Sequence, residues 1–379
     1  MKFIHTADWQ IGMKAAHVGE AGSRVREKRL EAARNVVEAA KEFGADFILV
    51  AGDTFEDNGV DPINIQKVAD ILGSFDGPVY IIPGNHDPFV PGSVWGHSSW
   101  KSHDNVHVLT EAEPMQITGG WLFPCPVLEK YSLKDPTAWI DTSGKDGIMV
   151  GMAHGNVEGL QLEEPDYPIP RDAAAHLGLD YLALGHWHSF GSFPGTDGAD
   201  RMVYSGTHES TGFGERDSGN VTLVEISEEG QAPSVTPERT GVLEWIDMRK
   251  EIMGEGDLDL VRKEIESVGE PSNCLVRLTL SGLLPLSEDE RLTDIKGVIA
   301  SRFLFGQVND LELYAAADDE EALEEIPDGI MREAGGVLIE LADPGYSGER
   351  PDGASPEVAL MAFRELYAIA RKQTDGGEQ

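Results

Sequence analysis

The sequence is constrained most by a series of short apolar runs, each followed within three residues by an Asp, Asn or His. Each run is four to six residues long, which suits a strand that is buried on both faces. Stretches with apolar residues at helical spacing separate the first run from the second and the second from the third. Strand and helix therefore alternate, which predicts an α/β fold. The runs are residues 2–5, 46–51, 79–82, 148–153 and 181–184, and the helices are expected at 23–43 and after Asp61-Pro62.

The pattern changes after about residue 190, where short strands are split by Gly-rich turns. A stretch that mixes Pro, Gly, Ser and Thr, residues 230–241, favours a boundary near residue 240. Beyond it we expect strands at 243–248, 274–280 and 310–315, with helices at 257–268, 288–303 and 356–372. We therefore predict a first domain over 1–240, a small α+β domain over 241–345 and a C-terminal helix and tail over 346–379.

Charge and cysteine content narrow the class of protein. The chain of 379 residues has 30 Lys and Arg against 67 Asp and Glu, a net charge of −37. This argues against an anionic partner unless basic residues gather locally, although an acidic surface also suits a high-salt habitat. Residues 1–50 hold 8 basic and 7 acidic side chains, so the acidity lies mostly elsewhere. Two cysteines, no export signal and no long apolar run predict a cytoplasmic protein that does not enter the membrane.

Almost every candidate metal ligand comes just after a predicted strand, where open α/β sheets place their sites. Carboxylate, carboxamide and imidazole groups would then meet at one edge, a mixture that suits two divalent ions sharing a bridging carboxylate. A single Asp or His at such a position usually caps a turn or packs, but the ordered set is hard to explain by chance. The set is Asp8, Asp53, Asn85, His86, Asp87, His154, His186 and His188.

These motifs resemble the calcineurin-like metallophosphoesterase superfamily, whose signature runs D-x-H, GD, GNH[DE], H and GHxH. HTADWQIG, GDTF, IPGNHD, GHWH and VYSGTHESTGFGE resemble more narrowly the nuclease subunits of SbcC-SbcD-type DNA repair complexes and their double-strand-break repair counterparts. The resemblance covers about residues 1–225. It implies a two-layered β-sandwich flanked by helices, with a small α+β capping domain.

The resemblance also implies the roles of the site residues. Asp8, Asp53 and His188 would hold a first ion together with position 10, and Asp53 would bridge to a second ion held by Asn85, His154 and His186. His86 would be catalytic. Asp87 would orient His86 or its loop, or it would have a plain turn role. The ions implied are two divalent metals, with Mn²⁺ preferred.

Position 10 departs from the family motif, because Gln10 stands where D-x-H has its histidine. A carboxamide oxygen is a weaker ligand than an imidazole nitrogen, so we expect the first ion to be held less tightly. His5 lies inside a predicted strand and is expected to pack or to support the site.

The implied activity is that of a DNA exonuclease, with single-strand endonuclease activity, in double-strand-break repair. The implied partners are DNA, an SbcC-type SMC-like ATPase and a second copy of the chain. Two alternatives remain: a phosphoesterase for a small substrate such as a cyclic nucleotide or phosphoprotein, and a catalytically weakened scaffold for the ATPase. DNA contacts are expected from Lys14, Arg24, Arg26 and Lys28 within a basic run that also holds Arg29 and Arg34, unless that run is a solvated helix face or a dimer contact.

The remaining aromatic and imidazole side chains receive structural interpretations. Trp9 and Trp187 adjoin candidate ligands and could stack on a base, but packing is favoured. Surface or loop positions are expected for His17, His97, His103, His107, His176 and His208.

Overall fold

The structure is a computed structural model that describes residues 1–159, 166–195, 197–285, 288–315, 319–351 and 354–375. The chain forms two compact units, Met1–Glu244 and Trp245–Gln379. Segment 346–379, predicted as a separate helix and tail, belongs to the second unit, and residues 376–379 lie outside the described residues. The described helices include no segment with both the length and the apolarity that crossing a membrane would require.

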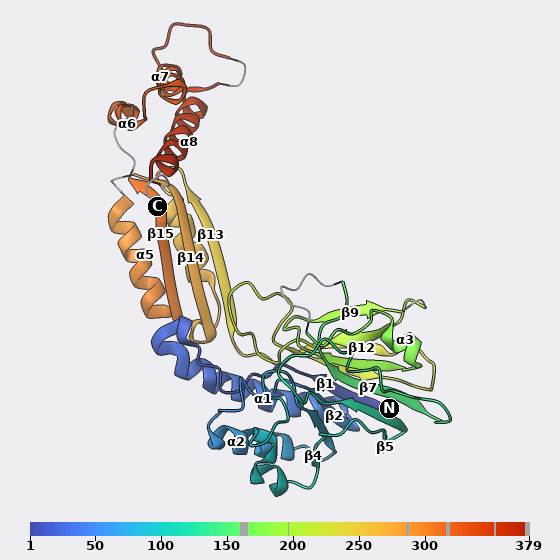
Figure 1. The fold of residues 1–379 in the computed structure, drawn as a ribbon. Coiled ribbons are helices and arrows are strands. Elements are labelled where there is room, and N and C mark those ends of the chain that lie inside the picture. Colours follow the sequence, from blue (N-terminus) through green and yellow to red (C-terminus); the bar gives the residue numbers. More distant parts are fainter. Residues whose placement is uncertain (160–165, 196, 286–287, 316–318, 352–353, 376–379) are drawn as a thin grey trace. The chain divides into compact units, whose positions relative to one another are not determined.

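Two six-stranded sheets build the first unit (Figure 1). Each sheet has a central parallel block. Antiparallel strands adjoin this block at one edge of the first sheet and at both edges of the second. The first sheet has the order β12 (Ser234–Arg239), β11 (Asn220–Glu225), β1 (Lys2–Thr6), β2 (Phe47–Ala51), β3 (Val79–Ile82) and β4 (Val106–Val108). The second has the order β5 (Met115–Ile117), β6 (Gly120–Cys125), β7 (Ile148–His154), β8 (Tyr181–Gly185), β10 (Asp200–Tyr204) and β9 (Gly191–Pro194).

Three apolar layers hold this unit together. One core lies between the first sheet and its helices, and includes Val36, Ile48 and Val68. A second, including Phe47 and Tyr181, joins the facing surfaces of the two sheets, and a third covers the outer face of the second sheet. The predicted two-layered sandwich with flanking helices is thereby confirmed. The helices are α1 (Gly22–Phe43), α2 (Pro62–Gly73) and α3 (Ala173–Leu177), with 3-10 turns η1 (Ala16–Ala21), η2 (Val94–Gly96) and η3 (Ser98–Ser102).

Half of the stretch at 230–241 forms the edge strand β12, which pairs with β11 near the end of the first unit. Pro237 lies opposite Thr222 in this pair. An edge strand tolerates a proline because one side of its backbone has no neighbouring strand to bond. The mixed composition therefore belongs to a sheet edge that closely precedes the division at Glu244.

The second unit is an α+β structure with a three-stranded sheet in the order β13-β14-β15. Helices α4 and α5 share a core with this sheet, and α6, α7 and α8 share another. No helix is predicted from the sequence where α7 lies. The elements are β13 (Glu244–Ile252), α4 (Asp257–Ser267), η4 (Pro271–Asn273), β14 (Cys274–Leu284), α5 (Asp289–Arg302), β15 (Phe305–Ala315), α6 (Asp319–Glu325), α7 (Ile330–Ala342) and α8 (Pro356–Asp375).

Candidate metal centre

Donor side chains collect at the carboxyl ends of strands from both sheets. Asp8 follows β1, Asp53 follows β2 and His186 follows β8, and all three residues have positive φ angles, of 54°, 51° and 111°. Such backbone costs about 1 to 3 kcal/mol per non-glycine residue and clusters at functional sites. His154 is the last residue of β7, and Asn85 lies in the loop after β3.

Four of these side chains point donor atoms at one another. Nε2 of His154 lies 2.8 Å from Oδ1 of Asn85 and 3.3 Å from Oδ2 of Asp53. Nδ1 of His186 lies 3.3 Å from the same Asn85 oxygen. Asp8, Asp53 and His154 each offer a ligand atom, and these three atoms lie within 4.8 Å of one another.

The proton positions in this cluster fit a bound cation. Nδ1 of His154 lies 2.9 Å from the carbonyl oxygen of Ala51, so it carries a hydrogen and donates to that oxygen. Nε2 is then the nitrogen that faces the oxygens of Asp53 and Asn85. If Nε2 carries no proton, its lone pair faces lone pairs of the Asp53 and Asn85 oxygens. A divalent ion could bind all three atoms as ligands.

The charges of the cluster are also buried. Asp8, Asp53 and His154 are at most 2% exposed. Burial raises the pKa of Asp8 to about 6. Burial opposes ionisation of Asp53 as well, but the adjacent His154 outweighs it and lowers that pKa to about 2, while Asp53 in turn raises the pKa of His154 to about 9 against the effect of burial. Ionised carboxylates at this depth are costly unless paired or bound to metal, so the donor set fits a divalent cation.

His86 and Asp87 differ in what they contact. The backbone amide of His86 donates to Oδ1 of Asp53 at 2.9 Å, and Nδ1 of its exposed ring donates to the carbonyl oxygen of Glu56 at 3.0 Å. Asp87 accepts hydrogen bonds from the amides of Phe55 and Gly84, at 2.9 and 2.7 Å. Asp87 therefore holds the loop around His86, and the His86 ring itself is oriented by a backbone carbonyl.

His188 has a partner that the sequence did not single out. Its Nδ1 lies 3.3 Å from Oε1 of Glu215, and Glu215 is itself held by the amide and hydroxyl of Thr211. Burial lowers the pKa of His188, but Glu215 and Asp8 outweigh it and raise that pKa. The sequence could have pointed to Glu215, because it is the one acidic residue of STGFGE, at the end of the later motif.

The loop that carries Asp8 and Gln10 is anchored by a buried arginine. The guanidinium of Arg29, 1% exposed, donates to the carbonyl oxygens of Trp9 and Glu209, so it joins this loop to the segment at 207–210. Gln10 is buried, and its backbone amide donates to the Asp53 carbonyl oxygen at 2.9 Å. Trp9 is fully buried and packs against His208, as the packing interpretation predicted; Trp187 packs against the outer core of the second sheet.

The basic run divides into surface and buried members. Lys14, Arg24 and Arg26 are exposed, and Lys28 forms an ion pair of 3.0 Å with Glu31. The sequence groups Arg29 with this basic run, for which an exposed position is expected. That expectation is wrong for Arg29, because its guanidinium donates to buried backbone carbonyl groups.

Two further histidines are buried. His208 lies in the loop between β10 and β11, one of the two expected placements, but it is fully buried there, and Nε2 donates to the carbonyl oxygen of Arg29 at 2.9 Å. His5 lies between the sheets, where Nδ1 bonds the Tyr181 hydroxyl and Nε2 the Leu184 carbonyl oxygen. Burial lowers the pKa of His5 to about 3, so the ring is neutral and packs within the sandwich.

The sandwich carries a buried donor cluster at its strand ends, an arrangement that suits a divalent metal ion. Residues 1–190 match the sequence profile of the calcineurin-like phosphoesterases, and the chain belongs to that family. A Bacillus subtilis (strain 168) protein described as uncharacterized metallophosphoesterase YhaO is 27% identical over 202 residues, which are 50% of this chain and 48% of the relative. The chain thus aligns with about half the length of this curated relative.

Two solved structures align with 63% of this chain and 98% of their own chains. The protein TT1561 of Thermus thermophilus has 12% sequence identity and a TM-score of 0.42. The other has 10% identity and the same TM-score.

Proposed function

We propose that this phosphoesterase is a DNA nuclease that acts in double-strand-break repair. The observation that carries the reaction class is the convergence of Asp53, Asn85, His154 and His186 on one point, with the exposed ring of His86 beside it. The substrate class is supported by HTADWQIG and VYSGTHESTGFGE, which resemble SbcC-SbcD-type nucleases. Both segments adjoin the centre, the first through Asp8 and the second through the contact of Glu215 with His188.

The donor set divides into two groups of ligands. Asn85, His154 and His186 would hold one ion, Asp8, Gln10 and His188 the other, and Asp53 would serve both. The chemistry that divalent ions supply at such a centre is activation of water and neutralisation of charge on the phosphate oxygens. Mixed oxygen and nitrogen donors suit Mn²⁺, and the carboxamide at Gln10 would make its ion the weaker of the two.

His86 is the catalytic residue in this scheme. Because its Nδ1 hydrogen is used by the Glu56 carbonyl oxygen, only Nε2 can exchange a proton with a substrate. A proton held at Nε2 can be donated to the leaving oxygen of the phosphodiester. The bond from its backbone amide to Asp53 keeps the ring next to the ligand cluster.

The partners follow from the same proposal. The second unit would act as the capping domain that presents DNA, and the chain would form a homodimer that works with an SbcC-type SMC-like ATPase. Lys14, Arg24, Arg26 and Lys28 would contribute phosphate contacts.

One assay tests the proposal. Purified protein with Mn²⁺, Mg²⁺ or a chelator is offered linear duplex DNA, single-stranded DNA, a cyclic nucleotide and a phosphopeptide. We expect metal-dependent cleavage of DNA, strongest with Mn²⁺. If only the cyclic nucleotide or the phosphopeptide is hydrolysed, the protein is a phosphoesterase for a small substrate and not a nuclease. No hydrolysis by protein shown to bind Mn²⁺ would favour a scaffold.

A further inference from the structure

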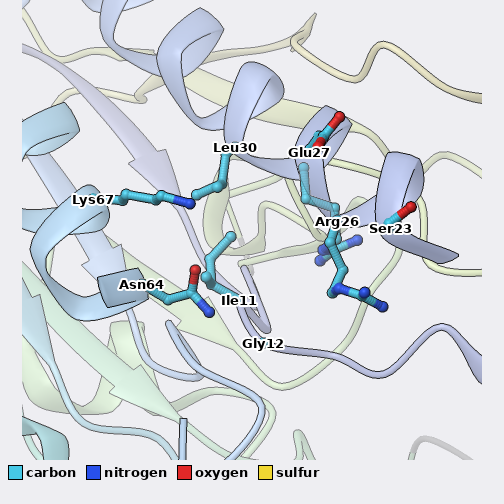
Figure 2. A pocket seen from close by; sticks show the side chains of 9 residues that line it. Ile11, Gly12, Ser23, Arg26, Glu27, Leu30, Asn64 and Lys67 are labelled. Carbon is cyan, nitrogen blue, oxygen red and sulfur yellow. The ribbon is translucent and has the colours of Figure 1, made fainter. Parts of the chain in front are cut away.

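A pocket of about 210 Å³ lies between helices α1 and α2, beside the loop that carries Asp8 and Gln10 (Figure 2). Asn64 and Lys67 line it from α2, and Ser23 and Arg26 line it from α1. Ile11 and Gly12 lie between the two helices. Gly12 has a φ of +104°, and a Cβ there would lie 2.6 Å from Cγ2 of Val60, so the loop needs glycine at this position.

The pocket presents cations that lack carboxylate partners. In the part of the chain that the structure describes, neither Arg26 nor Lys67 forms an ion pair, whereas Lys28 and Lys41 on α1 pair with Glu31 and Glu38. This is notable in a chain with 67 acidic and 30 basic residues. Glu27 is the one acidic residue among those that line the pocket.

A third cation, Arg29, also lines the pocket. Its hydrogen bonds go to buried backbone carbonyls, and Glu209, Glu215 and Glu56 lie close enough to interact with its charge. The positive charge open to a ligand therefore comes from Arg26 and Lys67.

Hydrogen-bond donors add to these charges. Nη1 of Arg26 donates to the carbonyl oxygen of Lys14 at 2.8 Å, which holds the guanidinium in place. Among the described residues its other N–H groups have no further acceptor. Helix α1 begins without a side-chain cap and without an acidic residue in its first turn, so the positive end of its dipole is not neutralised. Two cations, a hydroxyl, an amide and a helix start suit a phosphate group.

The pocket lies within a short stretch of chain from the candidate metal centre. Ile11 is three residues after Asp8, and three residues span at most about 11 Å. Phosphates of one strand follow each other at about 3.4 Å of rise in a duplex. A strand held at the metal centre can thus place another of its phosphates near the pocket within a few nucleotides.

We propose that this pocket binds a non-scissile phosphate of the nucleic-acid strand being cleaved. The inference rests on the proposed nuclease function and adds a basis for its selectivity: a substrate with a single phosphoester cannot use the pocket, and a polynucleotide can. Arg26 and Lys67 are the residues that recognise this second phosphate.

The test compares substrates with one phosphate and with many. The double variant Arg26→Gln, Lys67→Gln is assayed with Mn²⁺ on bis(p-nitrophenyl) phosphate and on single-stranded oligonucleotides of increasing length. In the unmodified protein we expect KM to fall once the oligonucleotide extends a few nucleotides past the scissile bond. The double variant should lose this fall, with KM for long oligonucleotides raised about tenfold or more, because hydrogen bonds to charged groups are strong. Hydrolysis of bis(p-nitrophenyl) phosphate should not change.

Binding gives a second measurement. The slope of log affinity against log salt for a single strand should decrease by about 0.7 for each lost phosphate contact. Calorimetric Mn²⁺ titration should be unchanged in the double variant. Lys41→Gln is a control for loss of a surface cation, because it removes one positive charge about 22 Å beyond Arg26 along α1. It should leave both the salt slope and the Mn²⁺ titration unaltered.

The outcomes separate the two proposals. If oligonucleotides are cleaved but KM and salt slope are the same in the double variant, the pocket does not bind the strand and the inference is overturned. An equal loss on both substrates would also overturn it, since the pocket would then support the metal centre. If only bis(p-nitrophenyl) phosphate is hydrolysed, by every form of the protein, the nuclease proposal itself is wrong.

Discussion

His86 differs from the candidate ligand histidines in what its two ring nitrogens can reach. His154 is fully buried, with Nδ1 on a carbonyl oxygen and Nε2 among acidic and amide oxygens. The His86 ring is exposed, with Nε2 open to a substrate. A proton donor needs that access, whereas a metal ligand needs surrounding donor atoms.

Replacing these two histidines should therefore have separable effects. We expect His86→Asn to retain Mn²⁺ and to lower turnover by about 10² to 10⁴, the usual contribution of general acid–base catalysis. His154→Asn should lose Mn²⁺ as well as turnover. Calorimetric titration and a nuclease assay on the same samples distinguish them. His176→Asn, on the exposed surface of α3, is the control; full metal content and full activity in both test variants would contradict the assignment.

Gln10 gives a test in the opposite direction. We expect Gln10→His to tighten the weaker Mn²⁺ site and to raise activity at limiting Mn²⁺, because imidazole is the better ligand. The backbone should tolerate the change, since Gln10 has a φ of 41° and histidine is among the residues enriched there. Two equally tight sites in the unmodified protein, unchanged by the substitution, would show that the departure from D-x-H has no effect on metal binding.

Glu215 should act on the metal centre only through His188. Its carboxylate fixes the hydrogen on Nδ1, so Nε2 of His188 would be the nitrogen that binds a metal ion. We expect Glu215→Gln to weaken the less tight Mn²⁺ site by about 10- to 100-fold, the usual cost of removing such a partner, and to leave the other site unchanged. Glu228→Gln removes a charge from an exposed turn and serves as the control. Identical calorimetric curves for both variants would remove Glu215 from the centre.

At the scale of elements, the strands that form the site were predictable and the elements around them less so. Apolar runs located β1, β2, β3, β7 and β8. The helix expected after Asp61-Pro62 is α2, and Asp61 caps it by accepting a 3.0 Å hydrogen bond from the amide of Ile63. β5 has only three residues, too few to show alternation. Helix α7 contains Gly335 and Gly336, which weaken a helical pattern, although Gly335 packs against Leu323 and Phe363.

Within the site, contacts between distant segments set the limit of prediction. No local pattern places Asp87 on the amide of Phe55, or Glu215 on His188. Arg29 did carry a signal, because it falls between Val25 and Ala33 at four-residue spacing on the inward face of α1. Its charge suggested a surface position, but its partners come from residues 9 and 207–210.

The turn after β2 couples backbone shape to the metal centre. Gly52 has a φ of +92°, and a Cβ there would lie 2.3 Å from Nδ1 of His154. We expect Gly52→Ala to displace the His154 ring and to weaken Mn²⁺ binding more than tenfold, in addition to destabilising the fold.

Gly44→Ala separates these two effects. Gly44 also has a positive φ, +67°, but a Cβ there would meet nothing within 4 Å. It should lose only about 1 to 2 kcal/mol of unfolding free energy to backbone strain, with Mn²⁺ affinity intact. Denaturant unfolding and calorimetry measure the two quantities. Equal Mn²⁺ affinity in both variants would mean that the turn yields without moving His154.

At the scale of the whole molecule, the two compact units carry different chemistry. All the candidate ligands lie in Met1–Glu244, and the second unit has 13 basic and 30 acidic residues over 135 positions. The first unit has 17 basic and 37 acidic residues over 244 positions, so net negative charge is denser in the second. Self-repulsion should therefore weigh more on the second unit, and metal binding should affect only the first.

Scanning calorimetry should consequently resolve two transitions with different sensitivities. Mn²⁺ at 100 times its dissociation constant stabilises the first unit by about 2.7 kcal/mol, which raises the Tm of a domain of this size by about 5 to 10 °C. Raising NaCl from 0.1 to 1 M shortens the Debye length from about 10 to 3 Å. This should raise the Tm of the second unit more than that of the first. The buried cluster of Asp8, Asp53 and His154 predicts that His154→Asn abolishes the Mn²⁺ shift and leaves the salt shift in place. A single transition that moves as one with both additives would show that the units unfold together, and a Mn²⁺ shift retained in His154→Asn would place the ion elsewhere.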